Sequence, residues 1–409
     1  MTQKDRNPIV CSFCYKDQHS VDKLIAAPSS AFICNECVDL CNKMIQACKE
    51  VFHERIHIPF PYQIKETLDE YIIGQEDTKK TLASAVVNHY KRIATNQIAD
   101  VEIEKSNILL IGPTGSGKTF LAKILAQTLK VPFVIVDATS LTEAGYVGED
   151  VENMLFKLLH AADYNLELAQ KGIIYIDEID KISKTSENKS ISRDVSGEGV
   201  QQALLKIIEG SQITLPQKMQ KRGKDISSID TKNILFICGG AFSGLDQIIE
   251  ASKSTTSIGF SSNKTKQFGH ECIDVHHLIK FGLIPELVGR LPIISKLNQF
   301  NKTDLINIMK NSKNSVLRQY EALFNSDNIK LEFTDEALDI IAAASLMQNT
   351  GARALKSILE KILLDSMYDI HNINHTLVID KNYLNKYNFL IKNYSNENNL
   401  GCQKIKSEK

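Results

Sequence analysis

A chain of 409 residues has room for two or three domains, and its formal net charge of −1 excludes an overall basic field that would recruit nucleic acid or an anionic membrane. No apolar run reaches the length of a membrane-spanning helix, and the first residues lack a signal-peptide core, so we expect a cytoplasmic protein. Nine cysteines are present, and the two CxxC pairs among them favour a metal site over disulfide bonds.

The first metal-ligating pattern consists of Cys11-Ser-Phe-Cys14 and Cys34-Asn-Glu-Cys37, which are separated by nineteen residues. Each CxxC turn can offer two thiolates to one ion, so the four cysteines fit a tetrahedral zinc site. Because all four ligands are thiolates, no position is left for a water molecule, and we expect Zn²⁺ to have a structural role. So short a segment buries little apolar surface, so the metal should supply much of its folding free energy.

We expect the zinc-binding domain to span residues 1–51 and to include a helix from Val38 to Val51. Its apolar positions are Leu40, Met44, Ile45 and Val51, and we expect Cys41 and Cys48 to be packing residues. Lysines and aromatic residues are sparse there, which favours an interaction or dimerisation module over a nucleic-acid reader. The closely spaced prolines Pro59 and Pro61 predict a linker over residues 52–63.

The central motif follows an apolar, strand-like run from Ile108 to Ile111 and precedes a helical pattern. This strand–GxxxxGK[ST]–helix order is the phosphate loop, whose glycines let backbone N–H groups surround a polyphosphate at a helix N-terminus. We expect Lys118 to reach the β- and γ-phosphates of ATP and the Thr119 hydroxyl to bind Mg²⁺. The expected nucleotide-binding residues are Gly112, Pro113, Thr114, Gly115, Ser116, Gly117, Lys118, Thr119 and Phe120.

A second apolar strand, from Ile173 to Ile176, ends in Asp177-Glu178, about sixty residues after the phosphate loop. A buried strand that ends in two carboxylates beside the phosphates resembles a Walker B segment. We expect Asp177 to hold Mg²⁺ through water, and Glu178 to orient or deprotonate the water that attacks the γ-phosphate. The pair therefore indicates hydrolysis of ATP, not only its binding.

Strand-like runs alternate with helical patterns through the middle of the chain, which predicts a doubly wound, mostly parallel α/β sheet with its ligand at the carboxyl ends of the strands. We expect this large ATPase domain to span residues 64–299. Its helices should include 77–93 and 151–162, and its remaining strands 133–136, 233–238 and 291–297.

Three stretches exceed what a simple ATPase needs. Gly145-Tyr146-Val147-Gly148 suggests a mobile paddle with an apolar tip, although an ordinary turn would give the same pattern. The loop 215–224 is basic, and taken alone it indicates only solvated charge. In the polar stretch 250–274, Ile258-Gly259-Phe260 suggests an apolar plug for a pocket on a partner protein, with a local tuck onto the domain surface as the alternative.

The carboxy-terminal part shows three helical patterns between Thr303 and Tyr368, followed by a strand-like run from Thr376 to Ile379. Leu305, Met309, Tyr320 and Leu323 share one face of the first pattern. We expect a small helical lid domain over residues 300–392 and a polar, disordered tail over 393–409.

Taken together, these motifs resemble the ClpX family, the AAA+ unfoldase subunits of Clp proteases, from Cys11 to about residue 385. Besides the cysteine pairs, the phosphate loop and Ile-Asp-Glu-Ile-Asp, the resemblance rests on the following segments: Gly145-Tyr-Val-Gly148, Arg193-Asp-Val-Ser-Gly-Glu-Gly-Val-Gln-Gln202, Ile258-Gly-Phe260, Gly282-Leu-Ile-Pro-Glu-Leu-Val-Gly-Arg290 and Gly351-Ala-Arg353.

The resemblance implies a homohexamer with ATP at subunit interfaces, where Arg290 would be the arginine finger and Arg353 the sensor-two arginine. It implies that Tyr146 and Val147 belong to the pore loop that moves substrate polypeptide, and that Ile258 to Phe260 dock into a ClpP-type peptidase. Protein substrates and adaptors would be the other partners. The chain departs from the family at Lys221-Arg-Gly223, where the second pore loop usually carries Arg-Lys-His. Positive charge is kept but the imidazole is missing, so we infer no tag preference from the family.

Some parts of a complete mechanism are not found by sequence alone. No polar sensor-one residue is evident between Asn233 and Gly239, and no peptidase nucleophile motif occurs in the chain. The leading interpretation is an ATP-driven protein unfoldase that feeds a partner peptidase. The alternatives are a nucleic-acid motor or loader whose zinc module reads DNA, and a remodelling factor that never meets a peptidase.

Overall fold

The computed structural model describes residues 10–27, 31–51, 58–95, 103–142, 149–183, 197–215, 228–255, 273–348, 350–373 and 375–387. The chain forms two compact units, 1–57 and 58–409. In the described part, no helix combines the length and the low charge needed to cross a bilayer.

The first unit is a small knuckle built around cysteines. An antiparallel pair, β1 (Leu24–Ala26) and β2 (Phe32–Cys34), leads directly into helix α1 (Asn35–Val51). The buried side chains are those of Cys11, Cys34 and Cys37, with few partly buried neighbours. The core is thus too small to hold the unit together by apolar burial alone.

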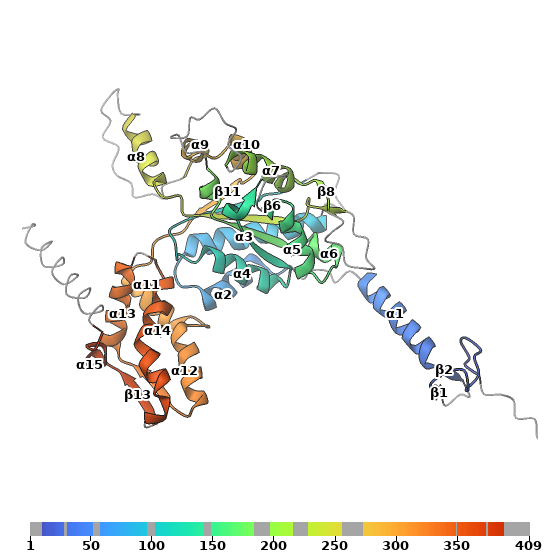
Figure 1. The fold of residues 1–409 in the computed structure, drawn as a ribbon. Helices are drawn as coiled ribbons and strands as arrows, with labels where there is room; N and C mark the ends of the chain where they lie inside the picture. Colours follow the sequence, from blue (N-terminus) through green and yellow to red (C-terminus); the bar gives the residue numbers. More distant parts are fainter. Residues whose placement is uncertain are drawn as a thin grey trace, which may run out of the picture. The chain divides into compact units, whose positions relative to one another are not determined.

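The second unit is organised around a five-stranded sheet with the order β11-β3-β10-β7-β4, in which all neighbours are parallel (Figure 1). The strands are β3 (Ile108–Ile111), β4 (Phe133–Asp137), β7 (Ile173–Asp177), β10 (Leu235–Gly240) and β11 (Ile293–Lys296). Each expected strand is present, and the α/β class with a mostly parallel sheet is confirmed.

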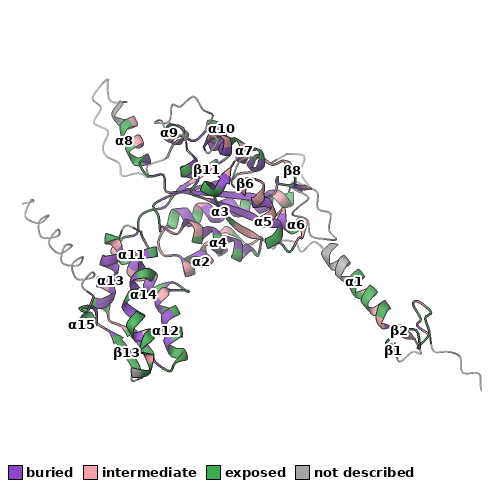
Figure 2. Cartoon of the chain, viewed as in Figure 1, coloured by how far each residue is buried: buried purple, intermediate pink, exposed green. Residues whose placement is uncertain are grey.

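Helices pack against the sheet and bury both of its faces. Alternate residues such as Leu109, Ile174 and Phe236 belong to one apolar cluster with the helices α5 and α7. Helix α3 contacts the edge strand β11, and α4 contacts β4, β7 and β10. Buried residues accordingly follow the sheet in Figure 2, and each fully buried Leu or Ile contributes about 1.5–3 kcal/mol. The helices described in this part of the chain are α2 (Pro61–Tyr71), α3 (Glu76–Thr95), α4 (Lys118–Leu129), α5 (Asn153–Ala161), α6 (Leu166–Ala169), α7 (Glu198–Glu209), α8 (Leu245–Thr255), α9 (Val275–Phe281) and α10 (Pro285–Gly289).

Short elements complete this layer. The 3₁₀ turns η1 (Ala138–Ser140) and η2 (Ile179–Ile182) follow β4 and β7. Two small pairs lie outside the main sheet: the parallel β5 (Leu141–Thr142) and β6 (Glu149–Asp150), and the antiparallel β8 (Gln212–Thr214) and β9 (Ser228–Asp230).

A helical part with its own core follows β11. Its elements are α11 (Lys302–Asn311), α12 (Val316–Ser326), β12 (Lys330–Phe333), α13 (Asp335–Met347), α14 (Arg353–Tyr368), η4 (Ile370–Asn372), β13 (Thr376–Ile379) and α15 (Lys381–Leu384). Residues such as Leu305, Ile341 and Leu359 form a cluster separate from the core around the sheet. Strands β12 and β13 pair in parallel across the long intervening segment.

The structure corrects the expectations in three places. The first expected lid helix is two helices, because α11 ends before Ser312 and the Ser315 side chain accepts the N–H of Arg318 at the start of α12. Leu323, which we expected on the apolar face of that helix, is 57% exposed. On α1, Leu40 and Met44 are exposed and Cys41 is only half-buried. Helix α2 starts at Pro61, inside the segment expected to be a linker, because proline suits the first helical position.

Candidate functional site

The phosphate loop connects β3 to α4 and takes its shape from glycines. Gly115 and Gly117 have φ angles of +78° and +95°, in the left-handed region that side chains disfavour. The N–H of Gly112 donates to the carbonyl of Gly240 at the end of β10, 3.2 Å away. The loop therefore lies at the carboxyl ends of the central strands, as the sequence predicts for a nucleotide site.

Lys118 and Thr119 open α4 with their side chains in the site. The Lys118 Nζ atom donates to the carbonyls of Gly112 and Pro113 at 2.5 and 3.0 Å. Burial lowers the pKa of Lys118, against the opposing effect of Asp177 and Asp180. The buried Ser116 Oγ has no hydrogen-bond partner within the described residues, so this polar atom fits a cradle for phosphate oxygens.

The end of β7 brings the expected carboxylates to the same loop. Thr119 Oγ1 donates to Asp177 Oδ2 at 2.9 Å, and the Tyr175 hydroxyl donates to Asp177 Oδ1 at 3.3 Å. A hydroxyl and a carboxylate at this distance are oxygen ligands of the kind that Mg²⁺ prefers. Glu178 is exposed and has a φ angle of +55°, which turns the chain away from the strand direction.

Asp180 is a buried residue of the site to which the sequence motifs assigned no role. Its carboxylate accepts the N–H groups of Ala241 and Phe242 at 3.1 and 3.3 Å. This ties the chain after β7 to the chain after β10 and holds the site's edge of the sheet together. The sequence contained a signal for this residue, because Asp180 is the last aspartate of the motif Ile-Asp-Glu-Ile-Asp.

A cavity of about 490 Å³ joins these residues to the helical part. The phosphate loop, Asp177, Glu178 and Arg353 line it, and Arg353 comes from the first turn of α14. An apolar stretch before α3, Tyr71 to Ile73, lines the cavity together with Phe300 and Val316. These apolar residues, which no sequence motif indicated, suit the flat face of a nucleotide base.

The helical part touches the phosphate loop directly. The N–H of Ala352 donates to the carbonyl of Gly115 at 3.3 Å. A Cβ atom at Gly115 would lie only 2.1 Å from the carbonyl oxygen of Thr350, and one at Gly351 would lie 2.9 Å from the carbonyl oxygen of Gly115. Both positions therefore require glycine, because backbone packs on backbone there.

Arg290 does not line that cavity. It follows α10, and its Nε atom donates to Glu209 Oε1 at 3.0 Å. Its carbonyl accepts the side-chain N–H of Asn107, which precedes β3. The structure thus brings Lys118, Thr119, Asp177, Glu178 and Arg353 together and places Arg290 elsewhere.

The four cysteines of the first unit converge. Their sulfur atoms all lie within 4.8 Å of one another, with Cys11 Sγ and Cys37 Sγ 3.9 Å apart. A tetrahedral zinc ion with Zn–S bonds of about 2.3 Å requires sulfurs roughly 3.8 Å apart, so the donors fit. Burial disfavours the Cys11 thiolate, but the backbone N–H groups of Cys14, Phe13 and Cys34 lower its pKa to about 6.

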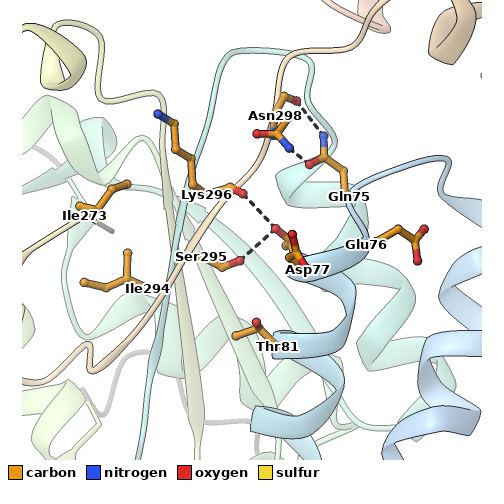
Figure 3. A pocket seen from close by; sticks show the side chains of 10 residues that line it. Gln75, Glu76, Asp77, Thr81, Ile273, Ile294, Ser295, Lys296 and Asn298 are labelled. Atoms are coloured by element: carbon orange, nitrogen blue, oxygen red, sulfur yellow. Dashed lines mark hydrogen bonds between the residues drawn. The ribbon is translucent and has the colours of Figure 1, made fainter. Parts of the chain in front are cut away.

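A second cavity, of about 470 Å³, lies between the start of α3 and the edge strand β11 (Figure 3). Its lining residues are Gln75, Glu76, Asp77, Thr78, Thr81, Ile273, Ile294, Ser295, Lys296 and Asn298. The Gln75 amide makes two hydrogen bonds to the backbone of Asn298, of 2.7 and 2.9 Å. None of the residues expected to bind nucleotide lines this cavity.

Several expected functional residues lie outside the described residues. These are the pore-loop pair Tyr146 and Val147, the charged segment 221–223, and the partner loop Ile258, Gly259 and Phe260. Their roles stay predictions. The sequence left the sensor-one residue unassigned between Asn233 and Gly239. In the structure, the Asn233 side chain, before β10, accepts a hydrogen bond from Arg92. Ser243, after β10, is a polar residue that lines the nucleotide cavity.

Comparisons with known families cover most of the chain. Residues 9–47 match the family described as ClpX C4-type zinc finger, residues 103–294 match the AAA domain (Cdc48 subfamily), and residues 300–373 match the C-terminal, D2-small domain of ClpB protein.

Curated relatives are similar over nearly their whole length. The ATP-dependent Clp protease ATP-binding subunit ClpX of Treponema denticola is 52% identical over 386 residues, which cover 91% of this chain and 93% of the relative. Proteins of the same name from Borrelia duttonii and Borrelia recurrentis are each 51% identical over 371 residues, which cover 88% of this chain and 86% of the relative.

Proposed function

This chain belongs to the ClpX family of ATP-binding subunits of ATP-dependent Clp proteases, and on that premise we propose that it uses ATP to unfold protein substrates and thread them into a ClpP-type peptidase. Membership of this family favours the protein unfoldase over the nucleic-acid motor that the zinc knuckle left open. The zinc-finger match and the four converging cysteines support Zn²⁺ as a structural ion of the first unit.

One observation supports the ATPase assignment above all others. The phosphate loop, the two carboxylates after β7 and an arginine from the helical part line one cavity at the carboxyl ends of parallel strands. Each group has a place in phosphoryl transfer, which depends on positioning and on electrostatic stabilisation of the transferred phosphoryl group.

The chemistry at this cavity follows from the donors and acceptors present. The phosphate-loop backbone and the Lys118 ammonium bind the phosphates of ATP. Thr119 and Asp177 would hold Mg²⁺, which would supply positive charge to offset that of the β- and γ-phosphates. Glu178 orients the attacking water and accepts its proton, and Arg353 binds the phosphates from the lid side.

The assembly supplies the remaining parts of the mechanism. Six copies form a ring, and Arg290 of each copy reaches the γ-phosphate of its neighbour. Tyr146 and Val147 grip substrate polypeptide in the pore, Ile258 to Phe260 dock into the peptidase, and the zinc unit dimerises and receives substrates or adaptors. The cytoplasmic location stays a prediction.

The deciding experiment mixes the purified protein with a ClpP-type peptidase, ATP and a folded, tagged substrate. We expect degradation that requires ATP, and a deletion of residues 258–260 should retain unfolding of the substrate while abolishing its degradation. Hydrolysis of ATP with no unfolding of any folded substrate, with or without the peptidase, would refute the proposal.

Replacement of Glu178 tests the chemical step on its own. Glu178→Gln keeps the shape of the side chain and one acceptor oxygen but removes the base, so ATP should bind with unchanged affinity while turnover falls by at least about a hundredfold. Binding is measured with a fluorescent ATP analogue, and turnover by phosphate release. Normal turnover would remove Glu178 from the mechanism.

A further inference from the structure

Arg290 is held at both ends by residues outside the nucleotide cavity. Its backbone carbonyl accepts from Asn107 Nδ2 at 2.9 Å, and Asn107 is buried with its Oδ1 accepting the N–H of Phe236 at 3.3 Å. Its guanidinium donates through Nε to Glu209 Oε1 at 3.0 Å. Hydrogen bonds therefore link the Arg290 backbone to the sheet through Asn107, and the Arg290 guanidinium to the end of α7 through Glu209.

The backbone at Glu209 is firmly placed. Leu204, Ile207 and Ile208 bury the last turns of α7. The helix ends at Gly210, whose φ angle is +102° and whose Cβ, if present, would lie 3.0 Å from Cα of Lys232. The carbonyl of the next residue, Ser211, accepts the backbone N–H of the buried Thr231, and the Ser211 N–H donates to the Thr231 hydroxyl oxygen. Glu209 thus projects from a rigid base.

The position of Glu209 is unfavourable for the helix itself. A carboxylate in the last turn opposes the helix dipole, which favours cations at that end. The ion pair with Arg290 does little for folding stability, because the two side chains are 45% and 50% exposed. A local cost without a local gain is expected where a residue serves function.

The geometry of the pair leaves the reactive side of the arginine available. A guanidinium has five N–H donors, and Glu209 engages the one on Nε. The four N–H groups on the two terminal nitrogens can still bind phosphate oxygens as a fork. The carboxylate consequently restricts the guanidinium without competing for its terminal nitrogens.

We propose that Glu209 is a positioning residue for the arginine finger: it orients the Arg290 guanidinium so that the terminal nitrogens meet the γ-phosphate of ATP bound to a neighbouring copy. This inference rests on the proposed function, in which Arg290 acts between subunits. Glu209 touches no nucleotide itself and acts through Arg290 alone.

The test compares steady-state ATP hydrolysis by the full-length assembly in several variants. Glu209→Ala should lower kcat about ten- to a hundredfold with little change in KM, because the finger stabilises the transition state more than bound ATP. Glu209→Gln should retain most of the activity, since its amide oxygen still accepts from Nε. Glu332→Ala, which removes a similarly exposed ion pair with Lys330, is the matched control and should have wild-type kinetics.

Combination with Arg290→Ala separates this inference from the proposed function. If Glu209 acts only through Arg290, the double variant should be no slower than Arg290→Ala alone. A further loss in the double variant, or a fully active Glu209→Ala beside an inactive Arg290→Ala, would overturn the inference. If Arg290→Ala itself hydrolyses ATP normally, it is the finger assignment in the proposed function that fails.

Mixed assemblies test whether the effect crosses the interface. Glu178→Gln subunits, which we expect to hydrolyse almost no ATP, carry an intact Glu209 and Arg290. Adding them to Glu209→Ala subunits should raise the ATPase rate per Glu209→Ala subunit, because each intact finger serves the neighbouring site. No increase would mean that Glu209 serves its own subunit's nucleotide, contrary to the inference.

Discussion

His89 illustrates how a single buried residue sets a pH dependence. It is 4% exposed, its Nε2 lies 3.1 Å from the carbonyl oxygen of Asn233, and burial together with the nearby Arg92 lowers its pKa to about 3. The folded protein therefore holds a neutral imidazole, whereas the unfolded chain protonates it near its ordinary pKa of about 6.5. Protonation then favours the unfolded state.

Stability should consequently fall as the pH drops from about 6.5 toward 3, by up to about 1.4 kcal/mol per pH unit for this one proton. His89→Gln, whose amide can still donate to Asn233, should flatten the dependence between pH 6.5 and 5. The measurement is the free energy of urea unfolding at several pH values. The exposed His160→Gln is the control and should keep the wild-type slope; an equal slope in His89→Gln would contradict the assignment.

The residues of the site differ in how far sequence could place them. Lys118, Thr119, Asp177 and Glu178 were predictable, because a phosphate loop and a strand-end carboxylate pair have fixed places on a parallel sheet. The pairing of Arg290 with Glu209 was not, because it joins α10 to α7 across 81 positions of sequence with no local pattern.

At the scale of elements, the segment between β11 and α11 is fixed by a side chain from the start of α3. Gln75 Nε2 donates to the carbonyl of Asn298, and the Asn298 N–H donates to Gln75 Oε1 (Figure 3). The Gln75 side-chain amide thus makes the two backbone hydrogen bonds that a neighbouring strand would otherwise make. Asn298 belongs to the connection from the sheet to the helical part. The amide therefore sets where that connection starts.

Loss of this amide should destabilise the protein. Gln75→Ala removes two hydrogen bonds and should cost about 1–3 kcal/mol. Gln75→Glu should be at least as harmful, because a carboxylate oxygen would face the Asn298 carbonyl. Thermal unfolding measures both, with the exposed Gln127→Ala on α4 as control. A Gln75→Glu protein as stable as the wild type would show that the bond to the Asn298 carbonyl contributes nothing.

Sequence patterns found the long elements and missed the short ones. The apolar runs of β3, β7 and β10 stand out because both faces of the sheet are buried. Strand β12 was missed, since its four residues alternate with the exposed Lys330 and Glu332 and its partner β13 lies far along the chain. The break between α11 and α12 was hidden because the apolar spacing continues across it.

At the scale of the whole molecule, the division into two units predicts separate responses to loss of metal. The first unit buries little beyond its cysteines, so zinc binding should account for much of its folding free energy, on the order of 10 kcal/mol. The second unit has large cores of its own. The two units should therefore not unfold together.

Removal of zinc by a chelator should unfold the first unit and leave ATP binding by the second unit unchanged. Released zinc is followed with a metal-sensitive dye, and nucleotide affinity with a fluorescent ATP analogue. Cys34→Ser should give the same result without chelator, and the half-buried Cys41→Ser should retain the metal. Loss of ATP affinity on chelation would show that the units depend on each other.

The contact of Gly115 with Thr350 and Gly351 couples the position of the helical part, the lid, to nucleotide binding. The helical part cannot shift relative to the phosphate loop without breaking the Ala352–Gly115 hydrogen bond or distorting the loop backbone. The position of the lid and the affinity for nucleotide are therefore thermodynamically linked, and each must change the other by the same free energy. A mechanical force on the lid should therefore change the affinity of the site for nucleotide.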